Sequence, residues 1–160
     1  MTPAKPVLVI DTNVWLDLLV FGDGSVERLR QAIADGAACL ASDAMRDELQ
    51  AVLSRPRFAL DEASRARALA AFDASVRRVA AAPDCRLACS DPDDRKFLDV
   101  AIGHRAHWLL SRDKALLRAR RHALGRFDLR IGAPLDFYNW LDSPPAVAAR
   151  SGSHPSSEVR

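Results

Sequence analysis

The sequence predicts an α/β fold of three layers, in which helices cover both faces of a central, mostly parallel sheet. Short apolar runs alternate along the chain with amphipathic helical segments, and such alternation packs as a parallel sheet between helices. The first run, residues 7–10, is aliphatic at every position, which is typical of a buried central strand. The length of 160 residues fits one domain.

Apolar runs and capping residues place the individual elements. Strands are expected at residues 7–10, 37–41, 107–110 and 129–131, with one more inside the ambiguous segment 76–90. Helices are expected over 14–21, 25–35, 42–53, 61–76, 91–105, 114–118 and 134–141. Ser25 and Ser42 begin two of these, because a serine side chain accepts a hydrogen bond from the first turn. Gly36 and Pro56 mark where those two helices end.

The composition excludes several classes of protein. Lys and Arg number 23 against 21 Asp and Glu, a net charge of +2, which rules out a polybasic coat and an acidic tail. No apolar run approaches the roughly 18–20 residues of a membrane span, and residues 1–6 carry no apolar signal region. We therefore expect a cytoplasmic protein without a membrane partner. Residues 143–160, rich in Pro, Ser and Gly, predict a disordered tail behind a folded domain of residues 1–142.

Two aspartates directly follow predicted strands. Asp11 follows residues 7–10, and Asp113 follows residues 107–110 after two intervening residues. Because parallel strands end at the same edge of a sheet, where α/β proteins bind ligands, both acids are candidates for one site. The alternative for each is a cap on the helix that follows.

Two further acids lie on or beside apolar helix faces. Asp94 shares a helical face with Phe97, Leu98 and Ala101, so we expect it to point toward the core. Glu48 borders the apolar face of helix 42–53, and its alternative is a surface glutamate paired with an arginine. If the four acids converge, they cannot all ionise unless a cation neutralises them. Hard oxygen ligands suit Mg²⁺ or Mn²⁺, and such an ion activates water for phosphoester hydrolysis.

The segments that contain these acids resemble the motifs of the PIN-domain family, in the branch of toxins related to VapC. They read VIDTNV at 9–14, RDEL at 46–49, DPDDRKFL at 91–98 and LSRD at 110–113, and the resemblance spans about residues 6–141. It implies a PIN-like fold and a metal-dependent endoribonuclease that hydrolyses single-stranded RNA. It also implies a toxin–antitoxin pair with a cognate antitoxin, and a homodimer.

The resemblance also implies which residues form the site. The catalytic and metal-binding residues are Asp11, Glu48, Asp94 and Asp113, and the supporting polar residues are Asn13, Ser111 and Asp91. Ser111 stands where many members have threonine, which keeps the hydroxyl. The choice between Asp93 and Asp94 stays open, with the apolar face in favour of Asp94.

A basic stretch begins beside the predicted site. Residues 112–130 contain Arg112, Lys114, Arg118, Arg120, Arg121, Arg126 and Arg130 against Asp113 and Asp128. The first three are candidates to bind RNA phosphates by charge. The alternative is a solvated helix face. A homodimer face is expected either at Trp15, Leu18 and Leu19 or at residues 58–60.

Two other functions remain open. A phosphatase of the haloacid-dehalogenase type also begins with an aspartate after an apolar strand, but it places a second aspartate two residues later. Here that position is Asn13, which cannot act as a general acid. The other alternative is a non-catalytic binding module with a PIN fold, because a fold alone does not establish activity.

Overall fold

The computed structural model describes residues 5–81 and 92–143, and its centre is a sheet of five strands in the order β3-β2-β1-β4-β5. The strands are β1 (Val7–Ile10), β2 (Ala38–Ala41), β3 (Val76–Arg78), β4 (Trp108–Leu110) and β5 (Arg130–Gly132). Every strand pair is parallel. In the centre, Leu8 pairs with Cys39 of β2 and with Trp108 of β4. The predicted α/β class is confirmed, and the described sheet is parallel throughout.

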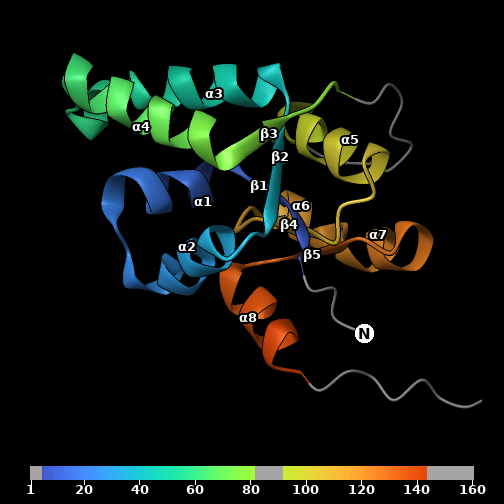
Figure 1. Ribbon diagram of the computed structural model, residues 1–160. Helices are drawn as coiled ribbons and strands as arrows, with labels where there is room; N and C mark the ends of the chain where they lie inside the picture. Colours follow the sequence, from blue (N-terminus) through green and yellow to red (C-terminus); the bar gives the residue numbers. More distant parts are fainter. Residues whose placement is uncertain (1–4, 82–91, 144–160) are drawn as a thin grey trace, which may run out of the picture.

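Helices cover both faces of this sheet (Figure 1). They are α1 (Thr12–Leu16), α2 (Glu27–Ala34), α3 (Asp43–Leu53), α4 (Glu62–Ser75), α5 (Arg95–Gly103), α6 (Lys114–Arg118), α7 (Arg120–Phe127) and α8 (Pro134–Asp142). Helices α1, α2 and α8 lie on one side of the sheet and α5 and α7 on the other (Figure 1). The three predicted layers are therefore present.

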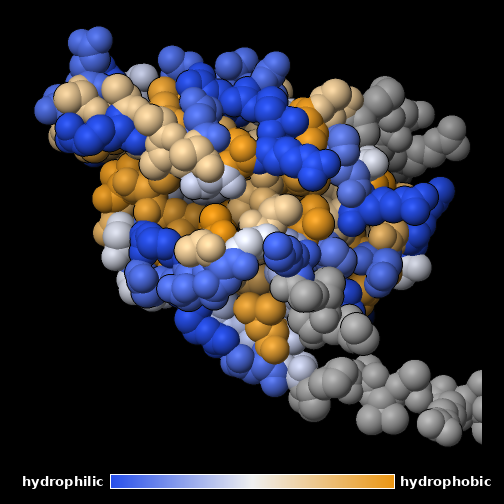
Figure 2. Space-filling model, viewed as in Figure 1, coloured by the Kyte–Doolittle hydropathy of each residue, from blue (hydrophilic) through white to orange (hydrophobic). Residues whose placement is uncertain are grey.

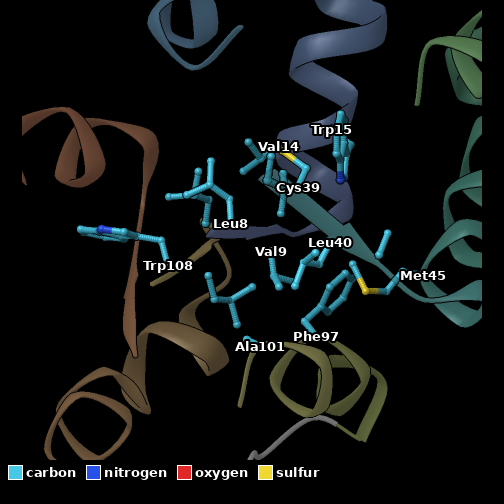
Figure 3. Close-up of a cluster of buried hydrophobic side chains, with 14 of the residues drawn as sticks. Leu8, Val9, Val14, Trp15, Cys39, Leu40, Met45, Phe97, Ala101 and Trp108 are labelled. Atoms are coloured by element: carbon cyan, nitrogen blue, oxygen red, sulfur yellow. The ribbon is translucent and has the colours of Figure 1, made fainter. Parts of the chain in front are cut away.

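The core lies between β1 and the helices on its two sides. Figure 3 shows Val9 and Leu40 directed toward Phe97 and Ala101 of α5, whereas Leu8 extends in the opposite direction. Val9 and Leu8 are both fully buried, which explains why this strand contains no polar residue. Burying one such aliphatic side chain stabilises the fold by about 1.5–3 kcal/mol.

Some predicted boundaries and roles are wrong. Ser25 does not cap a helix, because Asp23 accepts a hydrogen bond from the Ser25 backbone N–H at 2.9 Å and α2 begins two residues later. Helix α7 was not predicted, since its only buried residue is Ala123 and it has no continuous apolar face. The end of the first predicted helix is a π-helical turn, η1 (Asp17–Phe21). Ser42 does cap α3, with its hydroxyl 3.4 Å from the Met45 backbone nitrogen.

Trp15 and Leu18 belong to the core and not to a dimer face. The Trp15 ring packs edge-to-face on Phe72 of α4, with ring centroids 4.9 Å apart, and Leu18 is also buried. That correction removes two of the residues expected at a homodimer surface.

Several expectations concern residues outside the described ranges. Asp91 is one of them, and residues 144–160 are nearly the whole predicted tail. Within residues 5–81 and 92–143, no helix is both long and apolar enough to cross a membrane.

Candidate active site

Asp11 stands where β1 ends and α1 begins. Its backbone N–H donates to the Leu110 carbonyl at 2.9 Å, which extends the pairing of β1 with β4 by one residue. Its carbonyl accepts from the N–H groups of Val14 and Trp15, which starts α1. The carboxylate does not cap that helix, so the capping alternative does not describe the side chain. The side chain is only 5% exposed.

Ser111 joins Asp11 to the end of β4. The Ser111 hydroxyl donates to Oδ2 of Asp11 at 2.6 Å and accepts from the Asp113 backbone N–H at 2.9 Å. Ser111 is fully buried, and its own N–H donates to the Gly132 carbonyl at 2.9 Å. One hydroxyl group therefore connects the carboxyl ends of the two central strands.

Asp113 begins α6. Its Oδ1 accepts from the Ala115 backbone N–H at 2.7 Å, and this bond is the helix cap that was the alternative for this residue. Asp113 is half-buried, and its charge acts on Asp11. The Asp113 side chain therefore caps α6 and also acts by its charge on Asp11.

Glu48 on α3 contacts two side chains that the sequence did not single out. Its Oε2 accepts a short hydrogen bond from the Thr12 hydroxyl on α1. Its Oε1 lies 3.2 Å from Nζ of Lys96 on α5. Glu48 is a half-buried side chain paired with a lysine, and not the exposed partner of an arginine that was its alternative. Thr12 and Lys96 lie inside the motif segments 9–14 and 91–98, which is the signal that could have identified them.

Asp94 ends the 3₁₀ turn η4 (Pro92–Asp94) directly before α5. It is 7% exposed, whereas Asp93 is exposed, so the apolar-face argument correctly identified the buried acid. The Asp94 side chain does not cap α5. Because Lys96 follows two residues later and contacts Glu48, the start of α5 lies beside the acid of α3. Asn13, the other supporting residue that is described, is exposed on α1.

The electrostatics of the site centre on Asp11. Burial raises the pKa of its carboxyl group, and the negative charges of Glu48 and Asp113 raise it further. Hydrogen bonds from the Ser111 hydroxyl and the Thr12 backbone oppose this rise in the pKa. The neighbouring carboxylates therefore disfavour the ionisation of Asp11, and a bound cation would relieve that cost.

The acids fit a hard divalent cation in donor chemistry, because all four supply carboxylate oxygens. Their present arrangement is not a closed metal site. Within the described part of the chain, no three His, Cys, Asp or Glu side chains are grouped closely enough to hold an ion. Glu48 is directed at Thr12 and Lys96, and Asp113 at the first turn of α6. Lys96 therefore supplies part of the positive charge that an ion would supply.

The three residues predicted to bind RNA lie in two different environments. Arg112 forms an ion pair with Asp17 and donates to the Ser25 hydroxyl at 3.2 Å. Lys114 and Arg118 instead line a cleft of about 390 Å³. All three are exposed, but Arg112 has an acidic partner, whereas Lys114 and Arg118 form no ion pair within the described residues.

Comparison with known proteins identifies a family and a fold. A family model described as "PIN domain" matches residues 7–115. Among solved structures, the crystal structure of VapBC2 from Rickettsia felis, bound to a DNA fragment from their promoter, is similar with a TM-score of 0.56 and 14% sequence identity. That alignment covers 78% of this chain and 96% of the other. No curated protein sequence matches the chain. At this identity the structural likeness shows the fold.

Proposed function

Because this chain belongs to the PIN-domain family, we propose that it is a nuclease, and specifically a metal-dependent endoribonuclease that hydrolyses phosphodiester bonds of single-stranded RNA. The observation that carries the proposal is the Ser111 hydroxyl, which joins buried Asp11 to the backbone of Asp113 at the ends of β1 and β4. Because the chain matches the PIN-domain model, the alternative function as a haloacid-dehalogenase-type phosphatase is not proposed.

The proposed metal ligands are Asp11, Glu48, Asp94 and Asp113, and the ion would be Mg²⁺ or Mn²⁺. When bound, such an ion lowers the pKa of a water molecule and stabilises the charge that develops on the phosphate. The protein supplies the remaining functions. Ser111 favours the ionised form of Asp11, Thr12 orients Glu48, and Lys96 compensates the Glu48 charge. Asn13, and Asp91 outside the described residues, remain proposed supporting groups.

The proposed biological role is that of a toxin with a cognate antitoxin. Its support is the motif resemblance together with the likeness to a structure whose title names VapBC2. An apolar surface suited to a protein partner is present. Hydrophobic residues gather between η1 and α4 (Figure 2), where Leu19, Val20 and Leu60 line a cleft of about 390 Å³. We also propose that the chain forms a homodimer and that it acts in the cytoplasm.

One observation favours a second candidate, a PIN-fold binding module without turnover. Glu48 already has Thr12 and Lys96 as partners. A carboxylate that the protein itself neutralises has less need of a metal ion.

Cleavage of end-labelled single-stranded RNA tests the proposal. The purified chain is incubated with Mn²⁺ or Mg²⁺, or with excess EDTA, and the product ends are mapped. We expect internal cuts that leave 5′-phosphates, that require metal and that disappear in Asp11→Asn. The matched control is Asp47→Asn, an exposed acid on α3, which should cut normally. Cleavage that survives both EDTA and Asp11→Asn would contradict the proposal, and Mn²⁺ binding without cleavage of a varied RNA pool would favour the binding module.

A further inference from the structure

A cleft between α6 and α7 is lined almost entirely by cations. Its lining consists of Lys114, Leu117, Arg118, Arg120 and Arg121, around a volume of about 390 Å³. All four cations are exposed, and none of them forms an ion pair within residues 5–81 and 92–143. No acidic residue of the described ranges lines the cleft. Four like charges in one cleft repel each other, and a polyanion would relieve that repulsion.

Six other arginines of the described residues differ in this respect, because each has an acidic partner. Exposed arginines such as Arg55, Arg57 and Arg67 also form no ion pair within the described ranges, so the cleft is distinguished by the gathering of its cations around one volume. Those that face an acid are Arg28, Arg30, Arg46, Arg78, Arg112 and Arg130. The basic stretch 112–130 is therefore divided by the fold. Arg112 at its start faces Asp17, and Arg130 at its end lies near Asp128 and over the Trp140 ring at 5.6 Å. The cations between them that line the cleft keep their charge available.

The cleft adjoins the acidic edge of the sheet. Lys114 directly follows Asp113, whose backbone N–H donates to the same Ser111 hydroxyl that contacts Asp11. Helices α6 and α7 then follow one another along the chain (Figure 1). A strand whose phosphate reached the acids would therefore have this cleft next to it.

From this arrangement we propose that the α6–α7 cleft binds the phosphodiester backbone of single-stranded RNA next to the bond that is cut. The inference rests on the proposed nuclease function and names a substrate-holding site for it. Guanidinium groups suit phosphate because their donors match its oxygens in pairs. Half-buried Leu117 gives a ribose or base an apolar contact. Arg120 and Arg121 thereby join Lys114 and Arg118 as RNA-binding residues, and Arg112 does not.

RNA binding without cleavage is the test, measured by fluorescence anisotropy with a labelled single-stranded RNA in EDTA, on the full chain carrying Asp11→Asn. The cleft variant adds Arg118→Gln, Arg120→Gln and Arg121→Gln. The control variant instead adds Arg55→Gln, Arg57→Gln and Arg67→Gln, which removes the same charge in or beside α4, away from α7 (Figure 1). Circular dichroism and a melting curve establish that both variants are folded.

Counterion release sets the expected size of the effect. Each phosphate contact on a single strand contributes about 0.7 to the slope of log K against log salt. Losing three contacts should therefore lower the slope by about 2 and weaken binding roughly 50-fold near 0.15 M salt. The control variant should keep its slope. With Asp11 intact and metal present, the cleft variant should show a raised KM for RNA cleavage with kcat nearly unchanged.

Three outcomes decide the inference. Equal slopes and affinities for the cleft and control variants would overturn it, even if the chain cuts RNA in a metal-dependent way. Displacement of RNA by a polyglutamate peptide of equal charge, with equal potency, would also overturn it in favour of an acidic protein. Cleft-dependent RNA binding by a chain that cuts no RNA would support the cleft and contradict the nuclease, so the two failures are distinguishable.

Discussion

Replacing Ser111 with alanine tests how the protein holds a carboxylate in its interior. The Ser111 hydroxyl makes two hydrogen bonds, a buried one to the Asp11 carboxylate at 2.6 Å and a part-buried one from the Asp113 N–H at 2.9 Å. A hydrogen bond to a charged group is worth about 1.5–3 kcal/mol and a neutral one about 0.5–1.5 kcal/mol. Losing both should lower the free energy of unfolding by about 2 to 4.5 kcal/mol.

Urea denaturation followed by tryptophan fluorescence measures this free energy. The control is Ser54→Ala, an exposed serine whose hydroxyl donates to the Gln50 carbonyl at 3.0 Å. Its change should stay within about 0.5 kcal/mol. A double-mutant cycle with Asp11→Asn isolates the contribution of the charge. In the Asp11→Asn background both hydrogen bonds of Ser111 are neutral, so Ser111→Ala should cost only about 1 to 3 kcal/mol there. If Ser111→Ala costs the same in both backgrounds, the hydroxyl does not stabilise an ionised Asp11, and the reasoning is refuted.

Three more predictions follow from burial. Phe97→Ala should cost about 3–5 kcal/mol in urea denaturation because the ring is 1% exposed, whereas Phe21→Ala, 55% exposed, should change little. Burial raises the pKa of the Cys39 thiol to about 12, so iodoacetamide at pH 8 should leave Cys39 unmodified until urea unfolds the chain, as peptide mass spectrometry would show. Because the folded-state pKa of Asp11 is raised, its ionisation destabilises the metal-free fold. This destabilisation of the fold is absent below the ordinary Asp pKa of about 4, and it is complete above the raised pKa of Asp11 in the folded state. Asp11→Asn should therefore stabilise the fold at pH 7 but not at pH 3, and equal effects at both would contradict this.

The parts of the fold that depend on local pattern were predictable from the sequence. The aliphatic run of β1 is buried on both sides, so it has no polar alternation and reads directly as a central strand. Asp94 was expected inside because its helical neighbours are apolar, and the structure buries it. In both cases the physical cause acts within one element, where sequence spacing and spatial position correspond.

Contacts between distant elements were not predictable in the same way. The partners of Glu48 come from α1 and α5, and no spacing rule relates positions in three different helices. Arg112 appeared available to RNA because its partner Asp17 is 95 residues away in the sequence. Ser25 failed as a cap because Asp23, two residues earlier, accepts the hydrogen bond from the Ser25 N–H. These contacts share one cause, which is that a polar side chain takes whichever partner the fold brings near.

The charge of the side chains changes from negative to positive within a few residues after β4. The proposed acidic site and the proposed cationic cleft therefore follow one another directly along the chain. Asp113 contributes negative charge beside Asp11, and Lys114 directly after it opens the cationic cleft. Arg112, directly before Asp113, forms an ion pair with Asp17. A phosphate at the acids alone would be repelled unless a metal ion were present. Cations placed one residue further on would hold a strand against that repulsion, which is why we propose the acidic edge and the cleft as two halves of one RNA-binding surface.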